Sequence, residues 1–533
     1  MIDSENLKEK NGKKNYIFLL VLILILAFIL RYYKANAVNI WVDDAFSYFL
    51  SLESVSRILK TLYYTDAHPP LSYFFFHFWV KLGQNLLFLR FPGILMGTLS
   101  IIGVYLLGKE LISEKAGIIA AFMTAVSAAH IFMCWQIRMY PYLSFFIIFA
   151  FYFFTKLFAR GRASELRFDG TNRNSETCPL SESASGGLAH KHSSNEQRAT
   201  SNGIYWLLYT LFMVISWYLH YFAIFITIAH NIIVILFYRR INIKYWIYSQ
   251  LAIVICYLPW FKYLFFQLFT NRGPQETAFS WHFILMVYMF FTTHIIYIPG
   301  KYYYYFSVPM CSLLVLLSVM AVINNRKDRF MLAVVFIGFY AQFFMLYFKS
   351  LLTAQSVFQE RYFQYILPLY FLTIIASFVN KEKIKTFLAT IVILCFLIFN
   401  ASALYNMYYV KSFGIQRWTE ATDYIKKDYR NTDGIIIQSS YQAFPFNYYF
   451  TNCHKEYYVP GRDTKKLKYI LKNHKRVWMI MSFAWQDDPN NDATKWLAAN
   501  CKTIQTIRFK SFLENESADI IIWLFERKPE IKH

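Results

Sequence analysis

Long apolar runs separated by short polar loops fill the first three quarters of the chain. The runs reach roughly 18 to 22 residues, which lets an α-helix cross about 30 Å of hydrocarbon. No strand-like alternation accompanies them, so the pattern predicts membrane-spanning helices. The expected crossings, eleven in all, are 16–30, 86–107, 113–133, 138–158, 204–221, 222–238, 245–267, 304–323, 330–348, 362–379 and 386–407.

Lysine and arginine residues between these runs predict the orientation of the chain. Lys8, Lys10, Lys13 and Lys14 precede the first run, so the positive-inside rule places the amino terminus in the cytoplasm. Eleven crossings also keep the later basic loops cytoplasmic: 109–115, 239–244, 326–329 and 381–385. Two further apolar stretches, 71–82 and 281–299, are then expected to form helices on the outer face.

Two segments depart from the membrane pattern. Residues 159–203 are rich in Ser, Asn, Gly and mixed charge, which predicts a disordered cytoplasmic insertion. After the membrane region, 1–408, residues 409–533 become compatible with water. Strand-like runs at 434–438, 477–483, 503–509 and 519–525 alternate with candidate helices at 418–427, 464–473 and 493–500. The carboxyl-terminal segment is therefore expected to be a small α/β domain outside the membrane.

Composition supports this fold class, an α-helical polytopic membrane protein with a soluble tail domain. The chain is 57% hydrophobic and 16% charged, whereas soluble proteins carry about 25% charged residues. The net charge of +22 lies in short loops and in the tail, so it favours topology and anionic membrane lipids over nucleic acid. Cys453 and Cys501 both fall in the tail, where a disulfide between them is possible.

Polar residues interrupt the apolar sequence at the ends expected to face outward. An accumulation of acids, histidines, arginines and tyrosines on one face indicates a site. The residues are Asp43, Asp44, Asp66, His68, Arg138, Tyr140, His220, Tyr221, Gln359, Glu360, Arg361 and Tyr362.

The acidic pair Asp43-Asp44 follows the first crossing by about ten residues. A carboxylate beside a bilayer can take a proton from a hydroxyl nucleophile when desolvation raises its pKa. The alternative is a helix amino-terminal cap, because Asp is favoured there and helix-like sequence follows. An acidic doublet can also supply a helix cap with one residue and a base with the other.

Three basic residues are candidates for binding phosphate. His68 stands before Pro69-Pro70, which fixes the start of a helix. Arg138 and Arg361 can each donate two parallel hydrogen bonds to a phosphate. The alternatives are a local hydrogen-bonding role for His68 and snorkelling of the two arginines to the membrane interface.

These motifs, in order, resemble bacterial GT-C glycosyltransferases of the protein O-mannosyltransferase and aminoarabinose transferase type. The resemblance covers roughly 1–408. It is carried by short motifs: Trp41-Val42-Asp43-Asp44-Ala45, His68-Pro69-Pro70-Leu71, Arg90-Phe91-Pro92, Arg138-Met139-Tyr140-Pro141, His220-Tyr221, Pro259-Trp260 and Arg361-Tyr362. The family usually has Asp-Glu where this chain has Asp43-Asp44, and often Glu-Ala where Gln136-Ile137 precede Arg138.

The resemblance implies the GT-C fold and an inverting transfer of a sugar from a polyprenyl-phosphate donor to a lipid, glycan or protein acceptor. The reaction would take place on the external face of the bacterial cytoplasmic membrane. By position, Asp43 matches the family's aspartate that acts as the general base or orients the acceptor, and Asp44 is its neighbour. Charge complementarity assigns the donor phosphate to His68, Arg138 and Arg361, on the side opposite Asp43. The expected substrate pocket comprises Tyr140, His220, Tyr221, Glu360 and Tyr362.

No cofactor is expected, because no clear metal-ligand spacing occurs in the sequence. A divalent metal remains an alternative. The leading alternative function is a transporter or flippase, since intramembrane His, Arg and acidic residues also mark substrate paths. No internal repeat is evident in the two halves, and the polar residues concentrate at one face. A sensor with an external ligand-binding domain is a third possibility.

Overall fold

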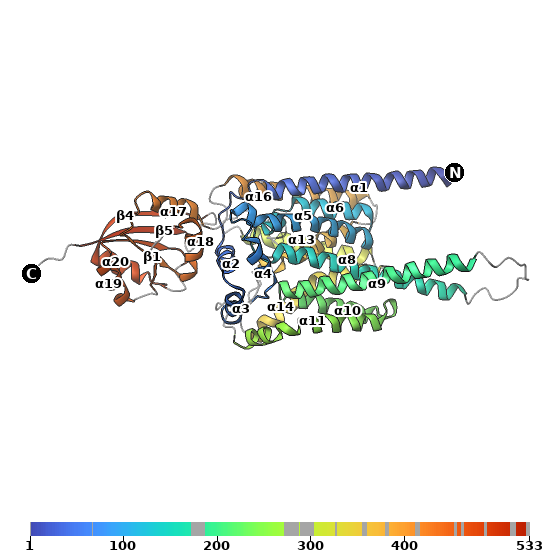
Figure 1. Ribbon diagram of the computed structural model, residues 1–533. Helices are drawn as coiled ribbons and strands as arrows, with labels where there is room; N and C mark the ends of the chain where they lie inside the picture. Colours follow the sequence, from blue (N-terminus) through green and yellow to red (C-terminus); the bar gives the residue numbers. More distant parts are fainter. Residues whose placement is uncertain are drawn as a thin grey trace, which may run out of the picture.

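The computed structural model describes most of the chain. The described residues are 2–66, 68–171, 187–270, 287, 291, 303–325, 328–353, 360–378, 383–410, 416–451, 456–459, 463–483, 488–511 and 519–528. They form a long helical bundle with a small sheet domain at one end (Figure 1).

Each crossing expected from the sequence has a helical counterpart. The helices of the bundle are α1 (Ile2–Tyr32), α5 (Leu86–Leu111), α6 (Glu114–Val126), α7 (Ala128–Cys134), α8 (Tyr140–Thr171), α9 (Gly187–Leu219), α10 (Ala223–Leu236), α11 (Ile243–Thr270), α13 (Tyr303–Asn324), α14 (Arg329–Thr353), α15 (Leu367–Ala376) and α16 (Lys383–Tyr409). Within the described residues, six helices are long and apolar enough to cross a membrane, and the pair α6–α7, bent by 62°, adds a seventh. The protein is therefore a multi-pass membrane protein.

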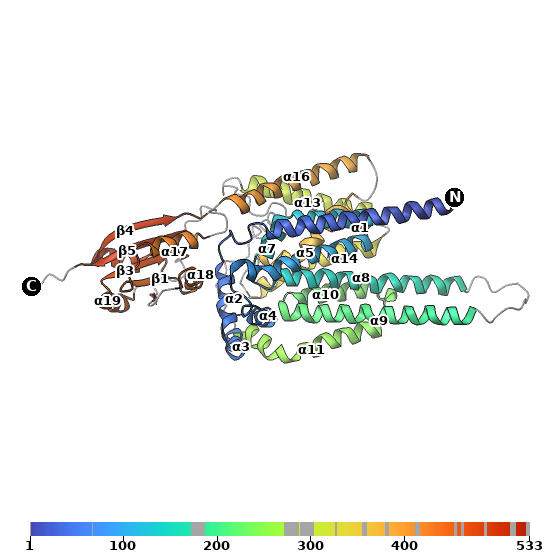
Figure 2. The same cartoon turned by 45° about the horizontal axis from the view of Figure 1, so that its top comes forward.

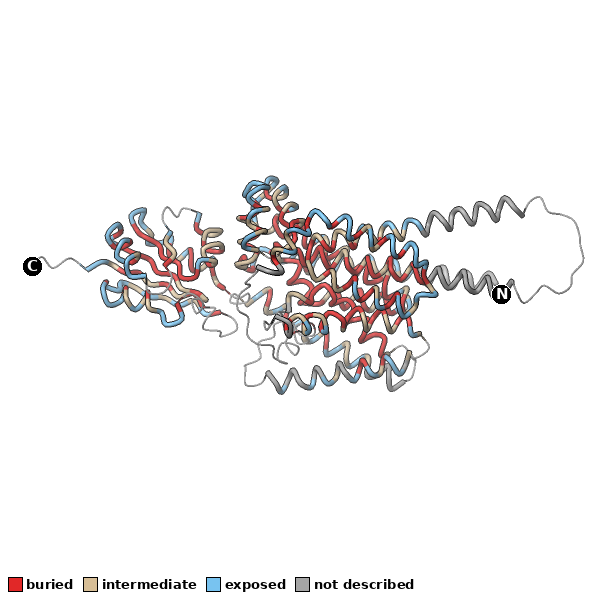
Figure 3. Tube along the Cα trace, turned by 90° about the horizontal axis from the view of Figure 1, so that it is seen from below, coloured by how far each residue is buried: buried red, intermediate tan, exposed pale blue. Residues whose placement is uncertain are grey.

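Buried and exposed positions also suit a lipid environment. Buried residues fill the centre of the bundle, whereas its outer surface carries many exposed positions (Figure 3). Large apolar side chains are exposed there, among them Leu22, Ile235, Ile255 and Ile398. In water such a surface would be unfavourable, but lipid chains solvate it.

The prediction of one crossing over 362–379 is wrong in detail. A 3-10 helix, η3 (Glu360–Ile366), comes first, and the short helix α15 follows. Pro368 lies in the first turn of α15, where its missing N–H costs no helical hydrogen bond. All ten residues of α15 are buried. The high hydrophobicity of this segment thus reflects burial among other helices.

Helix also extends into the segment expected to be disordered. α8 continues to Thr171 and α9 begins at Gly187, and both project past the end of the bundle remote from the sheet domain (Figure 2). The sequence after Phe158 contains good helix formers, such as Ala, Arg, Glu and Leu, which can prolong an existing helix. Residues 172–186 lie outside the described residues.

Three short helices cover the opposite end of the bundle: α2 (Val42–Leu52), α3 (Val55–Tyr64) and α4 (Leu71–Trp79) (Figure 1). α4 occupies the stretch 71–82 that was expected to be an outer-face helix. The other such stretch, 281–299, lies outside the described residues except Val287 and Phe291. The short helices separate the bundle from the sheet domain and carry several of the candidate site residues.

The tail forms a five-stranded sheet in the order β2-β1-β3-β5-β4. β1 (Gly434–Gln438) pairs in parallel with β2 (Glu456–Tyr458) and β3 (Arg476–Met481), whereas β5 (Ile520–Arg527) pairs antiparallel with β3 and β4 (Cys501–Phe509). Four helices accompany the sheet: α17 (Trp418–Lys426), α18 (Ala443–Tyr449), α19 (Thr464–Asn473) and α20 (Asp492–Asn500). Two apolar clusters, one with α17 and α18 and the other with α19 and α20, show that helices cover both faces of the sheet.

The expected strands and helices of the tail are confirmed, with two additions. β2 has only three residues, so it carries too little alternation to be read from sequence. α18 is a seven-residue helix with a proline inside it. Cys501 is a free, buried cysteine, so the disulfide considered for it is not formed in the structure, and Cys453 lies outside the described residues.

Candidate functional site

The acidic pair lies in the first turn of α2 and neither residue caps that helix. Trp41 is the N-cap residue, and no side chain makes a capping hydrogen bond. Successive residues of a helix point in directions about 100° apart, so the two carboxylates face different surroundings. The capping interpretation of the doublet is therefore wrong.

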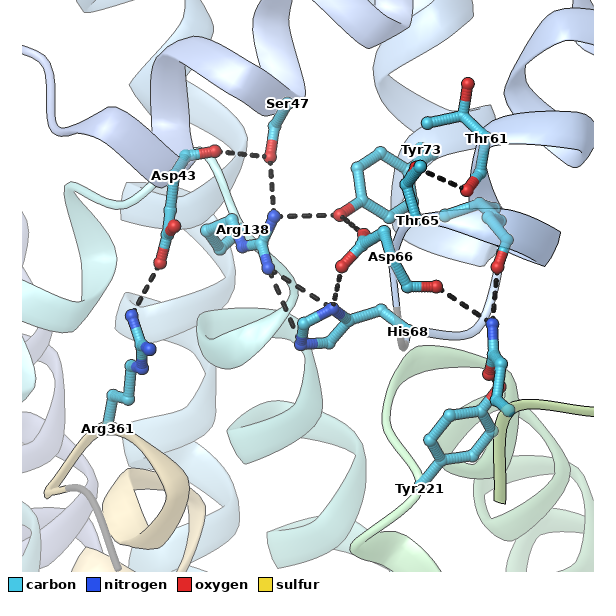
Figure 4. Close-up of polar contacts among 12 residues, drawn as sticks. Asp43, Ser47, Thr61, Thr65, Asp66, His68, Tyr73, Arg138, Tyr221 and Arg361 are labelled. Carbon is cyan, nitrogen blue, oxygen red and sulfur yellow. Dashed lines mark hydrogen bonds and ion pairs between the residues drawn. The ribbon is translucent and has the colours of Figure 1, made fainter. Parts of the chain in front are cut away.

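Asp43 pairs with Arg361. The distance from Arg361 Nη1 to Asp43 Oδ2 is 2.5 Å, and both side chains are about one-third exposed (Figure 4). Arg361 comes from η3, 318 residues further along the chain. The expectation that the two residues occupy opposite sides of a site is wrong, because their charged groups are in contact.

Asp44 points into the protein. Its side chain is 3% exposed, and Oδ1 accepts a hydrogen bond of 2.9 Å from the backbone N–H of Ile137. Burial raises the pKa of Asp44 to about 7, against the opposing effects of Arg90 and Arg138. Asp44 thus holds the backbone directly before Arg138.

Arg138 lies in the short segment between α7 and α8 and is 6% exposed. Nη1 donates to Ser47 Oγ at 3.1 Å and to Tyr73 Oη at 2.8 Å, and Nη2 lies 3.4 Å from His68 Nδ1. These partners come from α2, from α4 and from the segment before α4 (Figure 4). One guanidinium therefore joins three elements at the end of the bundle nearest the sheet domain (Figure 1).

Asp66 completes this cluster. Its carboxylate contacts His68 Nδ1 at 2.7 Å and accepts the hydroxyl hydrogen of Tyr73. Burial acts to raise the pKa of Asp66, but the interactions with His68 and Arg138, with the two hydrogen bonds, hold that pKa well below its usual range. Asp66 was singled out in the sequence without a role, and Ser47 and Tyr73 were missed. For Asp66, the sequence signal of a contact with His68 was its position two residues before that histidine.

Aromatic rings from distant elements surround His220, which follows α9. Its ring centre lies 5.6 Å from that of His68, 5.9 Å from Tyr362 and 6.0 Å from Tyr140. His220 Nδ1 accepts the backbone N–H of Phe222, which places the ring proton on Nε2. The structure thus brings His220, Tyr140 and Tyr362 together beside His68.

Tyr221, another expected pocket residue, makes its hydrogen bonds away from this group. Tyr221 donates its hydroxyl hydrogen to Gln267 and accepts one from Trp260. Gln267 in turn donates to the backbone carbonyls of Leu62 and Asp66, so Tyr221 supports the segment before His68 indirectly. The side chain of Glu360 lies outside the described residues.

Three buried donors of the cluster lack a hydrogen-bond partner among the described residues. They are Nε of Arg138, Nε of Arg361 and Nε2 of His220. Buried polar groups are almost always hydrogen-bonded, so unpartnered donors call for an acceptor. Two guanidinium groups and an imidazole N–H suit an anion with several oxygens, such as a phosphate.

A metal site has no comparable support. In the parts of the chain that the structure describes, no group of three or more His, Cys, Asp or Glu side chains is placed to hold a metal ion. Asp66 and His68 are adjacent but bind each other.

Residues 67–170 match the sequence model of a family described as dolichyl-phosphate-mannose-protein mannosyltransferase. No curated protein matches the chain by sequence. The crystal structure of ArnT from Cupriavidus metallidurans in the apo state is similar, with a TM-score of 0.57, 8% identity and coverage of 96% of this chain and 98% of that one. The structure of ArnT from the same organism bound to undecaprenyl phosphate gives a TM-score of 0.52, 10% identity and coverage of 95% and 97%. At these identities the likeness is one of fold.

Proposed function

We propose, from the GT-C fold and the matched mannosyltransferase segment, that this protein is a membrane glycosyltransferase. It transfers a sugar from a polyprenyl-phosphate donor to an acceptor on the external face of the cytoplasmic membrane. The bound undecaprenyl phosphate of the ArnT structure supports a polyprenyl donor. The basic residues at the start of α1, before its apolar stretch, support a cytoplasmic amino terminus and an external site and tail.

One observation carries the proposal: the half-buried carboxylate of Asp43 lies beside a cationic cluster that contains Arg138 and Arg361. Within the described residues, the Nε donors of both arginines and Nε2 of the neighbouring His220 lack acceptors. The donor phosphate would take hydrogen bonds from Arg138, Arg361 and His220, and the imidazole of His68 lies beside them. Each of these bonds strengthens as negative charge grows on the leaving phosphate. The cluster therefore stabilises the transition state more than the bound donor.

The proposed reaction is one inverting displacement. The acceptor oxygen forms a bond to the anomeric carbon as the bond from that carbon to the phosphate oxygen breaks. The acceptor proton passes to Asp43, and the electron pair of the broken bond stays with the polyprenyl phosphate. Arg361 contacts Asp43 directly, so it is placed to orient the base and bind the leaving group in turn.

Asp44 has a supporting role in this scheme. Its hydrogen bond to Ile137 fixes the segment that presents Arg138. The acceptor class, whether lipid, glycan or protein, and the sugar are set by surfaces beyond this cluster. The membrane region, 1–408, would carry the chemistry, and 409–533 would stand outside the membrane above it.

The test is donor consumption by purified protein in lipid vesicles, with a panel of polyprenyl-phosphate sugars and release of polyprenyl phosphate as the readout. We expect release by the wild type and a loss of at least about 100-fold in Arg361→Gln, because a charged donor to the leaving group is removed. Arg57→Gln is the matched control, since Arg57 is exposed on α3 at the same end of the bundle. Wild type that consumes no donor in the panel, but moves lipid-linked sugar between leaflets, would overturn the proposal in favour of a flippase.

A further inference from the structure

The tail domain makes hydrogen bonds to Asn39 and Ile40, in the segment that leads into α2. The hydroxyl of Tyr449, the last residue of α18, accepts the backbone N–H of Ile40 at 2.8 Å. Asn39 Nδ2 donates to the backbone carbonyl of Gln416 at 2.9 Å, and the hydroxyl of Thr419 donates to Asn39 Oδ1. Two consecutive residues, three and four positions before Asp43, are thus bound by the tail.

The outer face of α2 also packs against α18. The rings of Phe46 and Phe444 lie 5.3 Å apart, and those of Tyr48 and Tyr448 lie 5.1 Å apart, in edge-to-face arrangements. Figures 1 and 2 both show α18 beside α2. The contact surface of α2 toward the tail is therefore aromatic and close.

The inner face of α2 contacts the cationic cluster. Asp44 accepts from Ile137, and Ser47 accepts from Arg138. α2 is consequently held between the tail on one side and the Arg138 segment on the other. From the bundle side, Arg90 donates to the carbonyls of Val38 and Asn39 at 2.9 and 3.2 Å. Arg90 thus binds the backbone carbonyls of Val38 and Asn39, whereas Tyr449 binds the backbone N–H of Ile40.

We propose that Tyr449 and Thr419 are positioning residues for the reaction, and that the tail domain is an integral part of the active site through the segment 39–43. This inference rests on the proposed glycosyl transfer with Asp43 as base. A carboxylate must lie within hydrogen-bond reach of the acceptor hydroxyl, and displacement of about 1 Å is enough to slow such a step by orders of magnitude. The tail sets that position from outside the membrane region.

The sharpest variant is Tyr449→Phe, which removes one oxygen and keeps the ring. We expect kcat to fall about fivefold, the factor that corresponds to one neutral hydrogen bond, with KM for the lipid donor unchanged. Thr419→Val, which removes the hydrogen bond to Asn39, should act in the same direction. Tyr448→Phe is the matched control and should retain wild-type kcat, because among the described residues its hydroxyl hydrogen-bonds the carbonyl of Gln84 alone, at 3.4 Å.

Hydrogen exchange separates this inference from the proposed function, since it needs no donor. The amide of Ile40 should exchange faster in Tyr449→Phe than in wild type, and should be unchanged in Tyr448→Phe. Unchanged exchange at Ile40, or equal kcat in both variants, would overturn the inference. A rise in KM for the acceptor alone would also overturn it, because the tail would then bind substrate without positioning Asp43.

If the wild type transfers no sugar while Ile40 still loses protection in Tyr449→Phe, the proposed function fails and the contact between tail and α2 stands.

Discussion

Replacing Asp43 by Asn tests the base directly. The amide oxygen of Asn can still accept from Arg361, so the geometry is kept while the ability to take a proton is lost. General-base catalysis contributes typically 10²- to 10⁴-fold, which is about 3 to 5 kcal/mol of the barrier. We therefore expect kcat for sugar transfer to fall by at least 100-fold in Asp43→Asn.

The structure separates this loss from a loss of folding. The Asp43–Arg361 pair is about one-third exposed on each side, so solvent screens it and its contribution to stability is at most about 1 kcal/mol. For a chain of this length that corresponds to a change in Tm of about 2 °C or less. Asp423→Asn is the matched control, because Asp423 forms an exposed pair with Lys426, at 3.1 Å, in the tail.

The assay follows release of polyprenyl phosphate and transfer of labelled sugar in the same vesicles, with Tm measured on each sample. Activity of Asp43→Asn within about threefold of the wild type would refute Asp43 as the base, since no general-base contribution is that small. A fall in Tm of more than about 5 °C would instead show that the pair is structural.

Three further results are expected. Arg138→Lys keeps the charge but has one nitrogen where arginine has three, so it cannot bind Ser47 and Tyr73 and at the same time reach His68 and a phosphate. In the transfer assay kcat should therefore fall about 100-fold, and a fall of less than threefold would contradict this. Burial raises the pKa of Asp44 to about 7, so the wild-type folded state loses stability as the pH rises from about 4 to 7 and this carboxyl ionises. Asp44→Asn cannot ionise there, so its Tm should exceed that of the wild type at pH 8, and the difference should vanish toward pH 4. A Cβ on Gly93 would lie 2.6 Å from the carbonyl oxygen of Cys134, so Gly93→Ala should lower Tm, whereas Gly203→Ala, with nothing within 4 Å, should not.

Hydrophobic pattern and charge predicted the helices well, because lipid-facing and interior helices both need long apolar runs. The pattern fails where those two demands differ. α15 is as apolar as a membrane span although it has ten residues, all buried within the protein. Segment 281–299 stays a prediction. Short elements such as β2 and α18 lacked enough residues to show a period.

For the candidate site, the sequence pattern predicted several of the residues but not the contacts that those residues make with one another. Sequence marks Asp43 and Arg361 as separate candidates, and only the fold brings their charges together. Tyr73 and Ser47 look like ordinary helix residues, since nothing in their neighbourhood reveals that Arg138 will lie against them. Partners of this kind depend on long-range packing, which local patterns do not contain.

The distance along the chain between the two halves of the site has a consequence for biogenesis. Every residue from Ser47 to Arg138 that builds the cationic cluster is synthesised before the chain reaches α8, whereas Arg361 follows Asp43 by 318 positions. At about 5–20 residues per second, the ribosome needs roughly 15 to 60 seconds to add that cation after the acid. The nascent membrane protein therefore carries an incomplete candidate site until η3 has been synthesised, and a chain released before that point would lack the Asp43–Arg361 pair.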